Sequence, residues 1–72
     1  MKKVVYVKSC DGKTTKTEKV CEDLVDLMRT FDECVGSFRD FCKEYGEFQE
    51  KDLSVAEGHA LGMDYKVMII NA

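Results

Sequence analysis

The chain has 72 residues, of which 44% are hydrophobic and 35% charged, and its net charge is −3. This length suits one domain spanning residues 1–72, and it leaves little room for a deep substrate cavity beside a full core. No apolar run approaches the roughly 20 residues needed to cross a membrane. The apolar run Val4–Val7 is also too short for a secretory signal. We therefore expect a cytoplasmic globular protein.

The first twenty residues predict a β-hairpin. Residues 3–9 are rich in β-branched and aromatic side chains, which favour a strand. Asp11-Gly12 follows and predicts a tight turn, because glycine tolerates a positive φ. The segment Thr17–Val20 can then pair back on the first strand.

Between Val20 and Phe48 the hydrophobic pattern changes to a helical period. The apolar stripe consists of Val20, Leu24, Leu27, Phe31, Cys34, Phe38, Phe41, Tyr45 and Phe48. Such spacing is typical of a helix that covers a sheet, with a coiled-coil seam as the alternative. Gly36 lies in the middle, where glycine costs about 1 kcal/mol relative to alanine. We therefore expect a bend or two consecutive helices near Gly36, with Gly46 closing the second.

The last third of the chain predicts one more helix and one more strand. After an acidic connector at Glu47–Asp52, Ser54 and Glu57 form a capping-box pattern, which favours a short helix over Val55–Leu61. A strand in a terminal hairpin is the alternative for this segment. The run Tyr65–Ile70 predicts a central strand. The expected fold is an α+β domain, β-β-α-(α)-β, with a three-stranded antiparallel sheet and its helices packed on one face.

The four cysteines favour free, mostly buried thiols. They are Cys10, Cys21, Cys34 and Cys42. Disulfides are disfavoured because there is no export signal and because Cys34 and Cys42 lie two helical turns apart, at about 12 Å against a limit of about 7 Å. A zinc site that adds His59 is also disfavoured, since no short Cys-x2-Cys spacing occurs. We therefore expect no bound metal.

Charge is distributed unevenly along the sequence. Residues 1–20 hold six lysines against two acidic residues, whereas residues 21–72 hold twelve acidic residues against five basic ones. A solvated helix face is the simplest explanation for the acidic part. The alternative is a surface that imitates nucleic-acid phosphates and binds a basic groove on a larger protein. The candidate partner-binding residues are Glu22, Asp23, Asp26, Glu33, Asp40, Glu44 and Glu47.

The lysine-rich hairpin supports a second hypothesis. Lys8, Lys13 and Lys16 suit direct binding of nucleic acid by a homodimer. No arginine and no row of stacking aromatic residues accompanies them. Lysines also protect edge strands from aggregation, so this function ranks below protein binding.

Catalytic motifs are not recognisable in this sequence. His59 is the only histidine, and the five glycines form no phosphate-binding loop. We expect no enzyme activity, no catalytic residues and no cofactor. In general style, the short length and polarised surface resemble small regulatory or inhibitory proteins of phages and mobile elements, such as anti-CRISPR proteins, although no residue pattern carries the resemblance. The expected function is therefore a non-enzymatic interaction module or inhibitor, acting as a monomer or homodimer.

Overall fold

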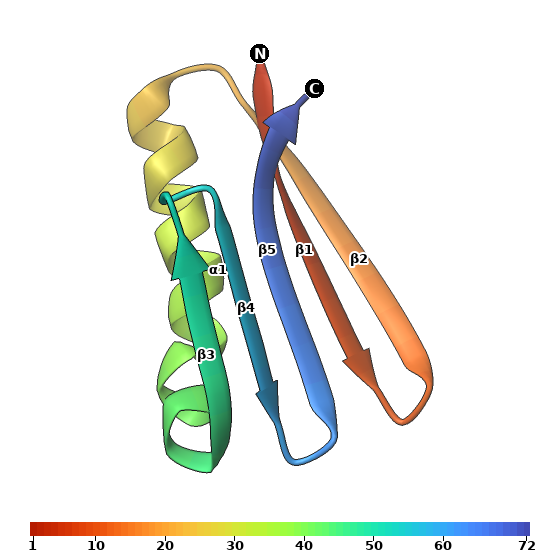
Figure 1. Ribbon diagram of the computed structural model, residues 1–72. Helices are drawn as coiled ribbons and strands as arrows, with labels where there is room; N and C mark the ends of the chain where they lie inside the picture. Colours follow the sequence, from red (N-terminus) through yellow and green to blue (C-terminus); the bar gives the residue numbers. More distant parts are fainter.

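The first and last strands of the chain lie side by side in the middle of one antiparallel sheet (Figure 1). The computed structural model describes residues 1–72. The elements, in chain order, are β1 (Lys2–Cys10), β2 (Lys13–Cys21), α1 (Leu24–Tyr45), β3 (Gly46–Lys51), β4 (Val55–Ala60) and β5 (Met63–Asn71). The five strands follow the order β2-β1-β5-β4-β3. Strands β1 and β5 pair along their full length, from Lys2 opposite Asn71 to Cys10 opposite Met63.

Helix α1 covers one face of this sheet and leaves the other face, here called the open face, without a covering element (Figure 1). The helix begins at Asp23, whose carboxylate accepts a hydrogen bond from the Asp26 amide at 2.7 Å. Its buried side chains lie on one face of the helix and are Leu27, Thr30, Phe31, Val35, Phe38 and Cys42. No helix of the structure is both long enough and apolar enough to cross a membrane.

The centre of the core is an aromatic cluster built around Phe38. Its ring stacks on Tyr65 with 4.9 Å between centroids, and the rings of Tyr6 and Phe48 each lie 5.9 Å away. Gly58 of β4 lies beneath the same ring, so close that a Cβ atom on it would be 3.0 Å from Phe38 Cδ2. The absence of a side chain at Gly58 therefore allows α1 to approach the sheet.

The predicted three-stranded sheet with several helices is wrong: the sheet has five strands and the structure has one helix. The predicted short helix at Val55–Leu61 is wrong, and the alternative of a strand in a terminal hairpin is confirmed by β4 and β5. The predicted connector Glu47–Asp52 is mostly β3. Ala56, Gly58 and Ala60 alternate on the side of β4 that α1 buries. Alanine and glycine have little intrinsic preference for strands, so this strand depends on tertiary packing.

The predicted bend at Gly36 is also wrong, because α1 runs without a break from Leu24 to Tyr45. Gly36 lies on the exposed side of the helix, and nothing lies within 4 Å of where its Cβ would be. The buried face continues on both sides of Gly36 and offsets its low helix propensity. Gly46 ends the helix as expected, and it lies so close to the carbonyl of His59 that a side chain there would collide.

Two other predictions are confirmed. The N-terminal hairpin forms between β1 and β2, and its turn places Asp11 at φ 51° and Gly12 at φ 78°. Positive φ at both central residues matches the right-handed twist of the paired strands. The predicted central strand at Tyr65–Ile70 lies within β5, the third of the five strands.

The substitution Gly36→Ala should stabilise the protein by about 1 kcal/mol, because alanine has the higher helix propensity and the site has free space. Chemical denaturation followed by circular dichroism measures this change. A loss of stability would contradict a straight, exposed helix at this position.

The same substitution at Gly58 should have the opposite sign. The new Cβ would lie 2.6 Å from Cys42 Sγ and 3.0 Å from Phe38 Cδ2, so the helix or the strand must move. Overpacking of this kind costs about 1–3 kcal/mol. Denaturation of Gly58→Ala alongside Gly36→Ala tests the packing of α1 on β4, and equal effects of the two substitutions would contradict it.

Candidate functional site

Three carboxylates form a row on the outward face of α1. Asp40 follows Glu33 by seven residues, and Glu44 follows Asp40 by four, which places all three within about 40° of one another around the helix axis. Along the axis the steps are about 10 Å and 6 Å. All three residues are exposed, and the Asp40 side chain retains 90% of its accessibility. We call Glu33, Asp40 and Glu44 the acidic line.

The acidic line is only partly neutralised. Arg39 Nε lies 3.7 Å from Asp40 Oδ1, an exposed contact that contributes little energy. Glu33 and Glu44 take part in no ion pair. Residues 22–45 together hold seven acidic residues and three basic ones, which gives this segment a formal charge of −4. Negative potential therefore remains on the outer side of the helix.

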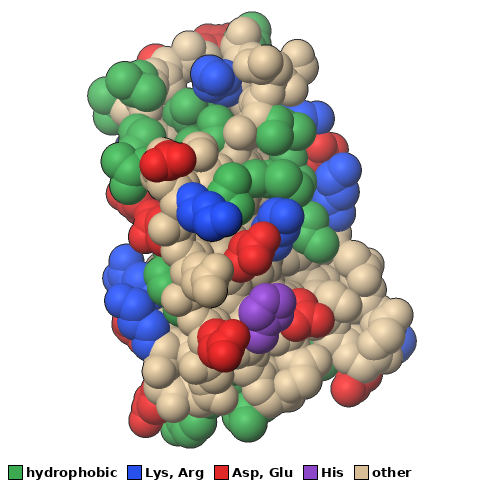
Figure 2. All heavy atoms as spheres, in the orientation of Figure 1, with side chains coloured by type: hydrophobic (Ala, Val, Ile, Leu, Met, Phe, Trp, Pro, Cys, Tyr) green, Lys and Arg blue, Asp and Glu red, His purple; other side chains and the backbone are tan.

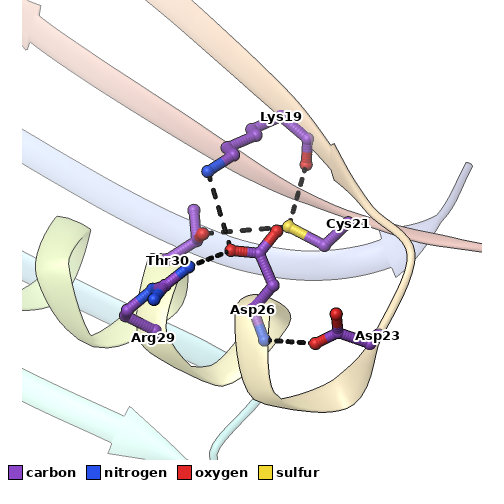
Figure 3. A network of polar contacts seen from close by, with 6 residues as sticks. All are labelled: Lys19, Cys21, Asp23, Asp26, Arg29 and Thr30. Carbon is purple, nitrogen blue, oxygen red and sulfur yellow. Dashed lines mark hydrogen bonds and ion pairs between the residues drawn. The ribbon is translucent and has the colours of Figure 1, made fainter.

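Two of the predicted partner-binding residues, Asp23 and Asp26, make contacts within the fold (Figure 3). Asp23 caps the helix, and Asp26 accepts a hydrogen bond from Arg29 at 2.7 Å while Lys19 Nζ lies 3.9 Å away. The thiol of Cys21 lies 3.8 Å from the Thr30 hydroxyl in the same group. Since Lys19 and Cys21 belong to β2, these contacts join the end of the hairpin to the start of α1.

The start of the helix also exposes two apolar side chains. Leu24 and Val25 are 71% and 75% exposed and follow the exposed Glu22 and Asp23. The sequence pattern placed Leu24 on the core-facing stripe, but in the structure the first buried position of α1 is Leu27. An exposed apolar pair beside carboxylates resembles the composition of a protein interface, where an apolar centre has a polar rim.

Glu47 does not belong to this surface. It lies on β3 opposite His59 of β4, with its side chain on the open face of the sheet. The helix ends at Tyr45 and the chain turns into β3 at Gly46. The helical spacing of apolar residues, which continues to Phe48 in the sequence, therefore does not predict where the Glu47 side chain lies. The structure thus places Glu22, Glu33, Asp40 and Glu44 on the side of α1 and Glu47 on the opposite side of the molecule.

The three lysines of the alternative hypothesis are divided between two faces. Lys8 and Lys13 line one shallow hollow together with Cys10 and Thr15. Lys16 pairs with Val7 in the register of β1 and β2, on the open face. A continuous lysine ribbon is therefore not formed, and this geometry gives the nucleic-acid hypothesis no specific support.

His59, Asp64 and Ser9 lie close together but do not have the order of a hydrolytic triad. His59 Nδ1 lies 2.6 Å from Asp64 Oδ1, and Ser9 is the register partner of Asp64 on its other side. A hydrolytic triad needs histidine between serine and the acid, whereas here the acid lies in the middle.

Burial disfavours the reactive thiolate form at two of the four cysteines. All four are free, and burial raises the pKa of the Cys34 and Cys42 thiols. A raised pKa disfavours the thiolate, the form that attacks substrates and binds metals. No group of three or more histidine, cysteine, aspartate or glutamate residues is arranged to hold a metal ion.

Asp26 should make stability depend on pH in the acid range. The hydrogen bond from Arg29, helped by Lys19, lowers the pKa of Asp26, so its contribution is present at neutral pH and is lost as the pH falls through the lowered value. Asp26→Asn keeps the side-chain volume and should lower the melting temperature at pH 7. The difference from the unmodified protein should shrink below about pH 4. A difference that stays constant across this pH range would contradict an electrostatic role.

Comparisons of the chain with protein-family models, curated proteins and solved structures found no match.

Proposed function

We propose that the protein is a non-enzymatic binding protein whose outer helix face attaches to a basic surface on a larger protein. The observation that carries the proposal is the acidic line, which lies on a face that no other element covers and includes two carboxylates without an ion pair. Aligned, exposed charges of one sign attract an oppositely charged partner over several ångströms and speed the encounter. Electrostatic attraction of this kind would weaken as salt is added.

The exposed start of the helix extends the proposed surface. Glu22 adds a further carboxylate, and Leu24 and Val25 supply apolar area that a partner can bury. Charged rims mainly set the rate and specificity of association, whereas buried apolar groups slow dissociation. The acidic line and this apolar pair therefore have complementary roles in the proposed contact.

The partner class that we propose is a protein that handles nucleic acids. A groove that binds phosphates concentrates positive charge, which a row of carboxylates can match. Occupation of such a groove would exclude the nucleic acid and make the chain an inhibitor, in the general manner of anti-CRISPR-type proteins.

Charge reversal in the acidic line should weaken partner binding while the fold persists. Glu33→Lys combined with Glu44→Lys removes the two unpaired carboxylates, and we expect affinity to fall at least about tenfold, as for other complementary charges at interfaces. Affinity capture from a bacterial lysate, with and without nuclease, identifies the partner by mass spectrometry. Calorimetry with that partner then measures the change.

The matched control is Glu50→Lys combined with Asp52→Lys, which changes the net charge by the same amount at exposed sites outside the helix. Equal losses in both double variants would mean that only net charge matters and would contradict a specific helix surface. Partners that disappear after nuclease treatment would instead direct attention to Lys8 and Lys13.

A further inference from the structure

The open face of the sheet carries an apolar cluster that no element of the chain covers. Side chains alternate along each strand, so the register of the sheet determines which residues point away from α1. The apolar members of the open face are Val5, Val7, Val20, Val55, Met68 and Ile70. In Figure 2 hydrophobic side chains gather in the upper half of this face, and the histidine with its acidic neighbours lies in the lower half.

This cluster is contiguous across the central strands. Val5 of β1 lies directly opposite Met68 of β5, which in turn lies opposite Val55 of β4. Val5 is completely buried by its neighbours alone, whereas Val20 and Ile70 are 51% and 40% exposed. A sheet face that meets only water is normally polar at alternate positions, so an apolar cluster here marks an interaction surface.

Charges on the open face are balanced and largely paired. The face carries four lysines and four acidic residues, namely Lys3, Lys16, Lys51, Lys66, Glu18, Glu47, Glu57 and Asp64. Lys3 pairs with Glu18 at 2.7 Å, and Lys66 pairs with Glu57 at 3.3 Å. A face with no net charge can meet an identical face without the repulsion that two acidic helix faces would suffer.

The distribution of these charges is also complementary to itself. Glu18 lies on β2 and Lys51 on β3, and the register places both at the level of Met68 on β5. A two-fold axis that is parallel to the central strand β5 and lies midway between the two sheets places β2 of one copy over β3 of the other. Glu18 then lies over Lys51 of the second copy, and the reciprocal contact forms on the other side of the axis. Met68 and Ile70 of β5 lie close to the axis and meet their own equivalents.

The size of the open face suits such a contact. Five strands spaced about 4.8 Å apart, each about 20–30 Å long, give a flat area on the order of 600 Å². Stable interfaces bury about 800 Å² of accessible surface on each partner. The accessible surface of the open face is larger than its flat area because side chains project from it. Sheets of this size pack face to face in β-sandwiches at about 10 Å.

We propose that two copies of the chain associate open face to open face about a two-fold axis along β5, burying the apolar cluster between the sheets. This association goes beyond the proposed function and does not depend on it, because α1 stays on the outside of both copies. The resulting four-layer particle would have a sheet–sheet core and a helix on each outer side. It would expose both acidic lines in opposite directions.

Sedimentation velocity over a wide range of protein concentration tests the proposal. The unmodified chain should reach twice its 8.2 kDa mass as concentration rises. Met68→Lys and Ile70→Lys place a charge near the axis in both copies at once, and each should raise the dissociation constant at least about tenfold. The matched control is Val25→Lys, which changes a 75% exposed valine on α1 and should leave the dissociation constant unchanged.

The charge pair provides the second test. Glu18→Lys and Lys51→Glu should each weaken the dimer, and the double variant should restore it, because the exchanged charges meet again across the two-fold axis. Circular dichroism confirms that each variant is folded. A chain that is monomeric at every concentration would overturn the proposal. A dimer that Val25→Lys disrupts, or a double variant that stays weak, would overturn it as well.

Discussion

The contact between Phe38 and the middle of the sheet is the interaction on which the remaining structure depends. The ring stacks on Tyr65 and lies over Gly58, so a large side chain of the helix meets the one position of β4 that has none. Close approach at this point lets one helix bury the central strands on one side. Because the chain has only this helix, the other side of the five-stranded sheet receives no cover.

Most residues of α1 are therefore engaged in contacts within the fold. Its inner side packs in the core, and its first turn contacts β2 through the ion pairs of Asp26 with Arg29 and with Lys19. Asp23 caps the helix and Asp26 bridges to a strand, so both carboxylates already have partners within the chain. The surface that we propose for recognition is therefore the acidic line together with the exposed residues at the start of the helix. It is smaller than the count of acidic residues in the sequence implies.

Sequence periodicity predicts an element correctly where the local conformational preference of the residues agrees with their packing in the fold. The N-terminal hairpin, the body of α1 and the last strand each combine a clear period with suitable residue types. Strand β4 was misassigned because its alanines and glycine have weak strand preferences, and its position follows from contact with Phe38 and Cys42. Glu47 was misplaced because the apolar period of the helix continues to Phe48, although the chain has already turned. Nothing in the sequence indicates that the turn after α1 places the Glu47 carboxylate on the open face of the sheet.

The pairing of β1 with β5 has a consequence for how the chain folds. The hairpin β1–β2 and the meander β3–β4–β5 each form through neighbouring segments, but Lys2 and Asn71 are separated by nearly the whole chain. Contacts of such long sequence separation form late and limit the folding rate. Until they form, the two strands destined for the centre of the sheet both present unpaired edges. Aggregation of newly made chains is thus most probable in this interval, and it ends when the hairpin docks onto the meander.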